Sequence, residues 1–300
     1  MTESTEPAVA RRRLAQALRA ARRAAPPPAG KKVLPQIQVA EAMGWHPSKL
    51  LRIEQAKTGI SKNDLHMLLA YYGAEHRFVD LWNGVSTQRS TSRWRDERDL
   101  VSAEFIRFLE YEESAETIRE YQPLLIPGLL QTEDYAQTVI EKFARPDDNR
   151  RRKERMLKLR LSRQRIWAEK RRCRLFVLLD HAAICRCVGG PAVMGAQLEK
   201  LQRLNEQDAV SIRVIPFDRD AHFGMSGPFI IVDFDGAAGR ILYLDERERK
   251  ISLDDPDTID PYLRHISEMT EVAATVAETN ALIDREIARM RRIDDTRLNS

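Results

Sequence analysis

Prolines and glycines divide the first eighty residues into segments too short for any long helix. A stiff connector, APPPAGKK at residues 25–32, holds three prolines and a glycine, and Gly44, Gly59 and Gly73 follow at short intervals. Proline inside a helix removes a hydrogen bond, and glycine readily adopts the positive φ that ends a helix. We therefore expect short helices that are unstable alone in water and must pack against one another.

Five such helices are expected, each with an apolar stripe. They span 11–24, 36–43, 47–56, 62–72 and 75–82. The ten residues before them are polar and are expected to be disordered, and Ser61 is a suitable cap for the fourth helix. A glycine-containing turn of three to four residues between the second and third helices is typical of a helix-turn-helix bundle. The expected core is Leu34, Val39, Met43, Leu50, Ile53, Leu65, Leu68 and Leu69.

The third helix, within WHPSKLLRIE at 45–54, carries its polar and apolar residues on opposite sides. If the apolar side packs on its neighbours, Ser48, Lys49 and Arg52 are left free to enter a DNA major groove, which is about 12 Å wide and admits one helix. Recognition helices present their N-terminal end to base edges. Lysine and arginine suit the guanine acceptors, and one good pair contributes about 1–3 kcal/mol of discrimination.

The predicted contacts extend beyond this helix. The residues expected to bind DNA are Gln36, His46, Pro47, Ser48, Lys49, Arg52 and Lys57. Gln36, at the start of the second helix, can place its amide against a phosphate. Glu54 would repel a phosphate, so we expect an internal role for it, paired with an arginine.

The distribution of charge agrees with a polyanion-binding module. Residues 1–75 hold twelve lysines and arginines against six acidic residues, whereas the whole chain has a net charge of only +4. The other 225 residues therefore sum to −2. A small basic module joined to a nearly neutral larger one indicates nucleic-acid binding by the first part and another task for the second.

The sequence predicts a helix-turn-helix domain over 1–82, a polar, serine-rich linker over 83–99 and an α+β domain over 100–300. Within 100–121 a helix is followed by an extended segment. Further helices are expected at 131–144, 150–169, 191–205 and 257–291, and strands at 171–179, 211–217, 228–234 and 241–246. The predicted fold class is thus an all-α N-terminal domain followed by an α+β C-terminal domain with a long C-terminal helix.

Two helices of the larger domain have several interpretations. Residues 145–174 hold fourteen basic against four acidic residues. They can form a second DNA-facing surface, a packed helix with a solvated basic face, or a dock for an acidic partner protein. The closing helix 257–291 has apolar residues at helical spacing, which serve either dimerisation or packing within the chain. A dimer places two heads one DNA turn apart, about 34 Å, on a palindrome.

Several classes are disfavoured by what the sequence lacks. It has no apolar stretch near the roughly 20 residues of a membrane span, and its N-terminus does not read as a secretory signal. Three cysteines fit a reducing cytoplasm better than a disulfide framework. Cys185 and Cys187 form a CxC without a second pair, so no metal or cofactor is expected.

The segment LPQIQVAEAMGWHPSKLLRIEQAKTG (34–59) resembles the pattern LTQxxLAxxLGxSxSxIxRIExG of XRE-type, phage-repressor-like helix-turn-helix regulators. The matching positions are Gln36, Ala40, Gly44, Ser48, Arg52, Ile53 and Glu54. The resemblance implies that Gln36, Ser48, Lys49 and Arg52 lie in the DNA interface. Two departures are the proline-rich insertion 25–32, whose lysines can reach the DNA backbone, and Leu51, where many relatives have a polar residue.

Much of the remaining chain also resembles a known group. Segments 110–140, 160–167, 179–201 and 211–234, with the strings PGLLQTEDYA and GPF, resemble the C-terminal domain of actinomycete antitoxin-like regulators. That resemblance implies transcriptional regulation, often with a small partner protein encoded nearby. Together with the residues, we expect a cytoplasmic regulator that binds double-stranded DNA as a homodimer and takes such a partner or a ligand as its signal.

Two alternatives remain open from the residues alone. One is an enzyme tethered to DNA by its head, with Asp180, His181, His222 and the acids at 110, 112 and 113 as candidate groups. No recognisable nucleophile, nucleotide or metal motif accompanies them, and His181 is expected to cap or pack beneath a short helix, so we expect no catalysis. The other is a protein-interaction module. Loops 189–190 and 222–227 either shape a binding site or are plain turns.

Overall fold

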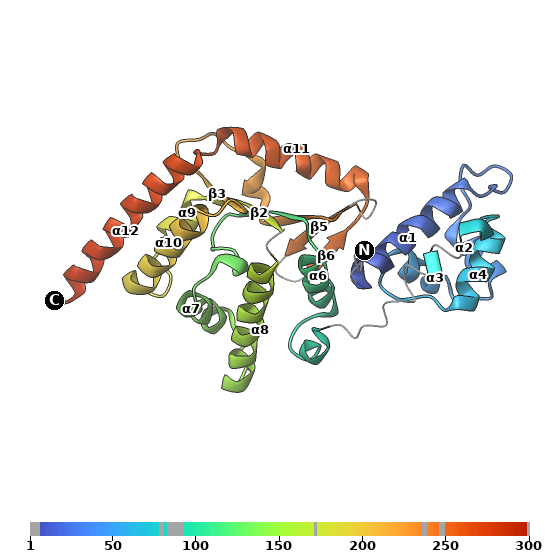
Figure 1. The fold of residues 1–300 in the computed structure, drawn as a ribbon, viewed down its shortest axis with the longest axis horizontal. Coiled ribbons are helices and arrows are strands. Elements are labelled where there is room, and N and C mark those ends of the chain that lie inside the picture. The colour runs from blue at the N-terminus through green and yellow to red at the C-terminus, as the bar shows by residue number, and fades with distance from the viewer. Residues whose placement is uncertain are drawn as a thin grey trace. The chain divides into compact units, whose positions relative to one another are not determined.

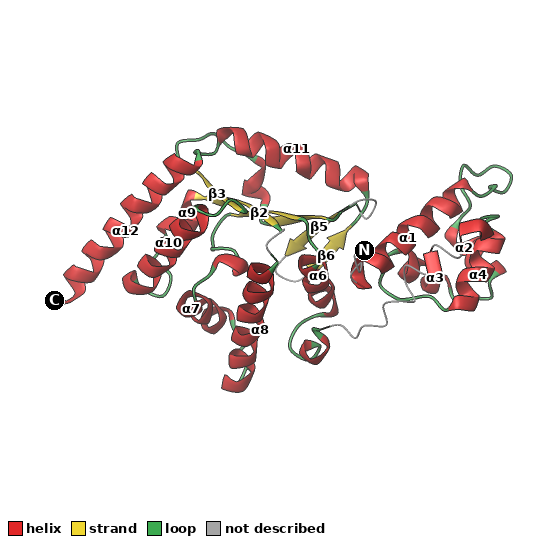
Figure 2. Cartoon of the chain, in the orientation of Figure 1, coloured by secondary structure: helices red, strands yellow, loops and turns green. Residues whose placement is uncertain are grey.

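The chain folds into two compact units in this computed structural model. The N-terminal unit takes residues 1–95 with 234–239, and the C-terminal unit takes 96–233 with 240–300. The structure describes residues 7–77, 81–82, 93–170, 173–235, 239–245 and 250–298. Of the predicted linker 83–99, residues 83–92 lie outside this description. The predicted fold class is confirmed: a helical N-terminal part is followed by a mixed α/β domain with a six-stranded sheet and a long C-terminal helix (Figure 2).

The N-terminal unit is built from short helices around one apolar core. Those in the described residues are α1 (Pro7–Ala24), α2 (Gln36–Ala42), α3 (Pro47–Glu54) and α4 (Lys62–Tyr71), followed by the 3-10 turn η1 (Glu75–Arg77). The core joins Leu14 and Leu18 of α1 to the residues expected from the sequence, with Met43 only partly buried at its edge. Ser61 caps α4 as predicted, because its hydroxyl accepts a hydrogen bond from the backbone N–H of Asp64 at 3.0 Å.

The start of this bundle differs from expectation, and its end is described only in part. Residues 7–10 are helical, whereas disorder was predicted, because Val9 and Ala10 are buried and extend the apolar face of α1 by one turn. Residues 1–6 lie outside the described part of the chain. Of the predicted fifth helix, residues 75–77 form the 3-10 turn and residues 81–82 are helical, and residues 78–80 lie outside the described part of the chain.

The C-terminal unit contains one mixed sheet in the order β3-β2-β1-β4-β5-β6. Its strands are β1 (Thr117–Gln122), β2 (Arg174–Asp180), β3 (Val210–Ile215), β4 (Phe229–Asp233), β5 (Arg240–Asp245) and β6 (Lys250–Leu253). β1, β2 and β3 are parallel, and β4, β5 and β6 continue the sheet in antiparallel pairs. The strands expected near 171–179, 211–217, 228–234 and 241–246 are present, whereas β6 was not predicted.

Helices cover both faces of this sheet (Figure 1). They are α6 (Ala103–Glu113), α7 (Glu133–Phe143), α8 (Arg150–Glu169), α9 (His181–Cys185), α10 (Pro191–Asn205), α11 (Pro256–Val272) and α12 (Val276–Leu298), with 3-10 turns η2 (Arg95–Glu97), η3 (Gly128–Leu130) and η4 (Phe223–Ser226). On one face Phe108 of α6 stacks on Tyr243 at 4.1 Å between ring centroids. On the other, Ile259 and Met269 of α11 pack with Tyr121. Within the described residues, no helix could cross a membrane.

The parallel half of the sheet fixes where a ligand site can lie. The chain runs from β1 through α7 and α8 to β2, and from β2 through α9 and α10 to β3. Helical crossovers are required between parallel strands, and they bring the carboxyl ends of those strands to one edge. Asp180, the last residue of β2, lies there and caps α9, because its Oδ1 accepts a hydrogen bond from the N–H of Ala182 at 2.9 Å. Asp180, not His181, is therefore the cap.

The prediction of a single closing helix over 257–291 is wrong, because residues 273–275 separate two helices, α11 and α12. Thr275 and Glu278 form a capping box: the Thr275 hydroxyl accepts from the N–H of Glu278, and the Glu278 carboxylate accepts from the N–H of Thr275 at 2.8 Å. Arg213 of β3 donates to the carbonyls of Ala273 and Ala274, both at 2.7 Å. Hydrogen bonds from Arg213 thus hold the segment that follows α11, and the capping box holds the start of α12.

The apolar stripe of this region packs within the chain. Ile266 and Met269 of α11 and Ile283 and Met290 of α12 are all buried. In the described part of the chain, only Val272 and Val276, beside the break, are exposed large apolar residues of α11 and α12. Intramolecular packing, one of the two interpretations, therefore accounts for the stripe, and dimerisation stays a prediction.

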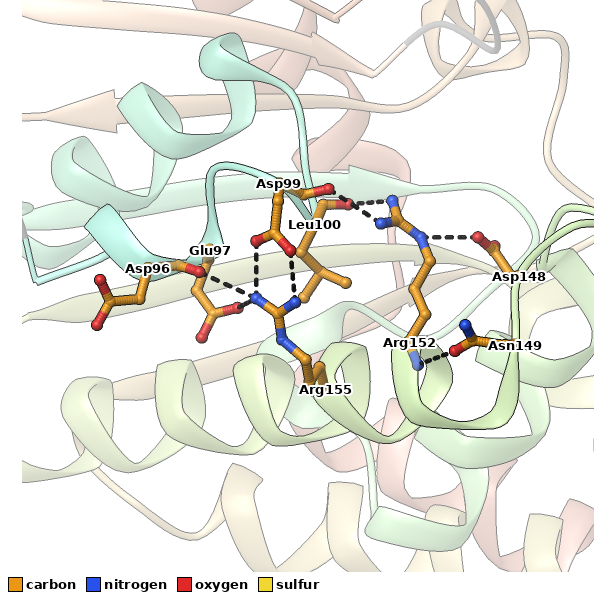
Figure 3. Close-up of polar contacts among 8 residues, drawn as sticks. All are labelled: Asp96, Glu97, Asp99, Leu100, Asp148, Asn149, Arg152 and Arg155. Carbon is orange, nitrogen blue, oxygen red and sulfur yellow. Dashed lines mark hydrogen bonds and ion pairs between the residues drawn. The ribbon is translucent and has the colours of Figure 1, made fainter.

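The end of the predicted linker is part of the C-terminal unit. The guanidinium of Arg155 on α8 contacts both carboxylate oxygens of Asp99, at 2.6 and 2.7 Å, together with Glu97 and the carbonyl of Asp96 (Figure 3). Hydrogen bonding to Arg155 lowers the pKa of Asp99 from 3.8 to about 2. Arg152 adds bonds to the carbonyls of Asp99 and Leu100.

Internal contacts also use other cations of α8. Arg163 forms a bidentate pair with Glu112 of α6, at 2.9 and 2.7 Å, and Arg160 donates to Gln131 at 2.7 Å. Arg151, Lys158 and Arg165, seven residues apart, remain exposed on one side of the helix. The packed interpretation thus holds for much of α8, while binding of DNA or an acidic partner by the exposed side stays a prediction.

Candidate nucleic-acid interface

The turn between α2 and α3 is held by a glycine in the left-handed conformation. Gly44 has φ +65, its N–H bonds the carbonyl of Glu41, and the N–H of Trp45 bonds the carbonyl of Ala40 at 2.7 Å. This pair of bonds is the Schellman motif, which ends a helix and satisfies its last carbonyls. Pro47 then occupies the first turn of α3, where its missing N–H costs nothing. The motif and the proline together fix the angle between the two helices.

The end of α3 repeats this motif without glycine. Ala56 has φ +53, and the N–H of Lys57 bonds the carbonyl of Arg52 at 2.8 Å. Ala56 stands where the pattern RIExG has glycine, so this chain keeps the left-handed turn with an alanine. The backbone of Lys57 is thereby fixed, and its exposed side chain makes no ion pair among the described residues.

A buried ion pair locks α1 to α3. Glu54, which is 1% exposed, receives two hydrogen bonds from Arg22, at 2.7 and 2.9 Å, and Arg22 also donates to the carbonyl of Leu34 at 2.7 Å. The hydrogen bond to Glu54 raises the pKa of Arg22, and desolvation raises the pKa of the neighbouring Tyr72. The internal role expected for Glu54, paired with an arginine, is confirmed.

Gln36 belongs to the same network. Its amide nitrogen donates to Oε2 of Glu54 at 2.6 Å, and the side chain is half-buried at the start of α2. One amide hydrogen is therefore committed inside the protein, and the second remains for a phosphate oxygen. The phosphate contact expected of Gln36 stays a prediction, with the added condition that Glu54 orients the amide.

Lys49 is not free, contrary to expectation. Its ammonium lies 3.0 Å from Oδ2 of Asp64 on α4 and 4.0 Å from the centroid of the Trp45 ring, and its side chain is 38% exposed. An exposed ion pair contributes about 0.2–1 kcal/mol, and an exposed cation–π contact about 0.5–1 kcal/mol. Moving Lys49 onto a base therefore costs about 1–2 kcal/mol, comparable to the gain from the base contact.

Arg52 has weaker commitments than Lys49. It is exposed, and its Nε bonds the carbonyl of Ser48 at 3.3 Å, one helical turn back. In the described part of the chain the guanidinium has no acidic partner, so it can reach a guanine without breaking an ion pair.

His46 caps α3: its Nδ1 lies 3.3 Å from the N–H of Ser48 and 2.8 Å from the Ser48 hydroxyl. The seven predicted residues therefore lie on or beside α2 and α3.

Two exposed apolar side chains extend this surface. Leu51 is 40% exposed on α3, and Ile37 is 57% exposed on α2. Apolar side chains in a groove contact the methyl group of thymine. The sequence analysis names Leu51 but not Ile37. Ile37 falls outside the apolar stripe formed by Val39, Ala40 and Met43, and such an isolated apolar residue on the polar side of a helix is the signal that could have identified it.

Comparison with known families agrees with this geometry. Residues 13–82 match a family model described as a helix-turn-helix domain, so the chain is a DNA-binding transcriptional regulator. Residues 105–285, more than half of the chain, match a domain of unknown function, DUF5753, and the chain belongs to that family. No curated protein and no solved structure matches it.

The candidate catalytic groups of the C-terminal unit do not form one site. Glu112 is committed to Arg163, whereas Asp180 and His222 approach at the carboxyl edge of the sheet, with 3.8 Å between Oδ2 and Nε2. That distance exceeds a hydrogen bond. His181 stacks on Phe217 at 4.6 Å between ring centroids. The loop 222–227 packs inward at Gly224, where an added Cβ would lie 2.4 Å from Tyr121.

Proposed function

We propose that the chain is a cytoplasmic, dimeric, antitoxin-like regulator of the actinomycete type, which recognises operator DNA through α3 and responds to a signal through its C-terminal unit. The observation that carries the DNA-reading part is the exposed edge of α3, where Arg52 has no acidic partner among the described residues. The resemblance of segments 110–140 and 211–234 to antitoxin-like regulators supports the class. The signal is a small partner protein or a ligand.

Dimerisation is proposed on energetic grounds. One bundle of this size makes few phosphate contacts, and such binding weakens steeply with salt. Two bundles about 34 Å apart read both halves of a palindrome and add their contacts. Light scattering with and without operator DNA tests this, and a complex with one chain per palindromic operator contradicts it.

The test of DNA recognition is fluorescence anisotropy with the DNA upstream of the gene. We expect Arg52→Ala to weaken binding by about 1–3 kcal/mol and to reduce the preference for operator over unrelated DNA. Arg23→Ala is the matched control, because Arg23 is exposed on α1 and carries the same charge. If Arg52→Ala and Arg23→Ala lose the same binding affinity, both for operator DNA and for unrelated DNA, α3 does not lie in the interface.

The salt dependence of binding distinguishes this proposal from a protein-interaction module. Neutralising phosphates releases counterions, so the logarithm of affinity should fall linearly with the logarithm of salt concentration, by about 0.9 per phosphate contacted.

We also propose that the chain is not an enzyme. Asp180 is committed to capping α9 and stands beyond hydrogen-bond distance of His222, which supports this. Turnover of a small-molecule panel, lost in His222→Ala, would contradict it.

A further inference from the structure

One group of side chains in the described residues has the composition of a metal site. His181, Cys185 and Glu286 each offer one ligand atom, and these atoms lie within 4.8 Å of one another. His181 and Cys185 are four residues apart on α9, so they share one face of that helix. Glu286 reaches them from α12, about a hundred residues later in the chain. Imidazole nitrogen, thiolate sulfur and carboxylate oxygen are the ligands that zinc takes in proteins.

The place of this group in the fold is also typical of a ligand site. α9 begins immediately after β2, at the edge where the parallel strands end. In open α/β sheets, ligands bind outside the carboxyl ends of the strands. His181, the first residue of α9, stands at that edge, which places the ligand group where the fold itself favours binding.

Neighbours orient two of the three side chains and hold the backbone of the third. The His181 ring stacks on Phe217, and its Nδ1 is buried without a hydrogen-bond partner in the described structure. A buried polar atom of this kind destabilises the fold unless a hydrogen bond or a metal ion satisfies it. Arg289 donates to Oε2 of Glu286 at 2.6 Å and also to the carbonyl oxygen of Cys185. One arginine thus holds α12 against α9, as supporting residues around metal ligands do.

We propose that His181, Cys185 and Glu286 bind one divalent transition-metal ion, with zinc as the reference ion. In a tetrahedral zinc site with bonds of 2.0–2.3 Å, ligand atoms stand about 3.3–3.6 Å apart. A shift of about 1 Å in the side chains closes the difference. Three protein ligands leave a fourth position for water or an exogenous ligand.

The charges around the site fit one dication. A neutral imidazole, a thiolate and a carboxylate supply two negative charges, which balance the ion. On binding, the thiol proton of Cys185 passes to solvent as the metal–sulfur bond forms. Arg289 and the nearby Arg285 oppose the ion, and the nearby carboxylates of Asp180 and Asp218 offset them. The inference does not depend on DNA binding by the N-terminal unit.

A simpler arrangement competes with this one. The thiol of Cys185 can donate a hydrogen bond to Glu286 with no metal present, and the three residues then serve only to join α9 to α12. The two arrangements differ in one measurable respect. A hydrogen-bonded thiol has no affinity for zinc above that of an ordinary surface cysteine such as Cys187, which is half-exposed two residues away.

The experiment uses the whole 300-residue chain, stripped with a chelator and titrated with zinc against a chromophoric competitor. We expect one equivalent to bind, and Co²⁺ to give a thiolate charge-transfer band in the near ultraviolet. Cys185→Ser and Glu286→Gln keep the shapes of the side chains, and each should weaken zinc binding by about 100-fold or more, since loss of a supporting residue alone costs 10–100-fold. Cys187→Ser is the matched control and should bind as the parent does.

Three results would overturn the proposal. They are no binding above the level of the Cys185→Ser variant, equal losses in Cys185→Ser and Cys187→Ser, and a cobalt complex without the thiolate band. Circular dichroism and thermal unfolding of each metal-free variant are measured first. Loss of fold in Cys185→Ser leaves Glu286→Gln and His181→Gln to decide, because each removes a different ligand.

Discussion

Replacing Asp64 by asparagine is expected to strengthen operator binding, although Asp64 itself lies outside the predicted contacts. Asp64 holds the ammonium of Lys49 at 3.0 Å, and the two side chains are 27% and 38% exposed. Lys49 can reach a base only by leaving this pair. Asp64→Asn removes the charge while keeping the size of the side chain and the hydrogen bond that the backbone N–H of residue 64 donates to the Ser61 hydroxyl.

The magnitude follows from the two contacts of Lys49. The ion pair contributes about 0.2–1 kcal/mol at this exposure, and the Trp45 contact, which the variant keeps, about 0.5–1 kcal/mol. Removing the first should therefore raise the DNA affinity by at most about fivefold, since 1.4 kcal/mol corresponds to tenfold. The free energy of unfolding should fall by about 0.3–1 kcal/mol, because an acid in the first turn of α4 favours the helix.

The assay is fluorescence anisotropy with operator DNA at fixed low salt, where electrostatic differences are least screened. The variants are Asp64→Asn, Lys49→Ala and the double variant. Glu75→Gln is the matched control, because Glu75 is an exposed acid of the same unit whose loss changes the net charge equally. We expect the gain in Asp64→Asn to disappear when Lys49 is also replaced.

Two outcomes would refute this reasoning. If the double variant keeps the gain over Lys49→Ala, the gain comes from net charge and not from release of Lys49. If Glu75→Gln gives the same gain as Asp64→Asn, the position of the charge is immaterial. Either result would leave Arg52 as the principal base-contacting cation of α3.

The remaining predictions concern the interface, the buried pair and the anchor on α8. Lys49→Ala should weaken operator binding by less than Arg52→Ala, in the same anisotropy assay, because Lys49 must first leave Asp64; the reverse order would refute the estimate. Glu54→Gln leaves Arg22 buried beside a neutral amide and should lower the free energy of unfolding by about 3–5 kcal/mol. The midpoint of urea unfolding measures this loss, and Glu41→Gln, at an exposed position, is the control. The folded state lowers the pKa of Asp99 to about 2, so its contribution to stability is present above about pH 4 and is lost as the pH falls towards 2. Arg155→Met should therefore lower the thermal midpoint at pH 6 and have little effect near pH 2; an equal loss at both pH values would contradict the role given to this pair.

Sequence patterns predicted those features that depend on neighbours in the chain. Gly44 and Gly73, both at positive φ, end their helices as expected, and Ser61 begins one. The bounds of α8 and α10 follow from local helical patterns in the same way. The capping box at Thr275 and Glu278 is also local, and it divides into two helices a region whose apolar spacing alone predicts one.

The features that escaped prediction depend on distant partners. Residues 96–99 have the composition of a linker, but Arg155, more than fifty residues later, binds them. Strand β6 has only four residues, and its pairing with β5 is what identifies it. The amino-acid type of Lys49 correctly indicated a surface cation, yet nothing near it in sequence revealed that Asp64 and Trp45 would hold it.

The shared carboxylate of Glu54 has a consequence for how operator preference can change. Leu51 and Arg52 face outward, so we expect that each can be exchanged alone, with an effect on base preference and little effect on folding. Gln36 lacks that independence, since any replacement also disturbs the carboxylate that neutralises Arg22. Natural or engineered shifts in target sequence should therefore accumulate on α3, while Gln36 changes only together with compensating substitutions beneath it.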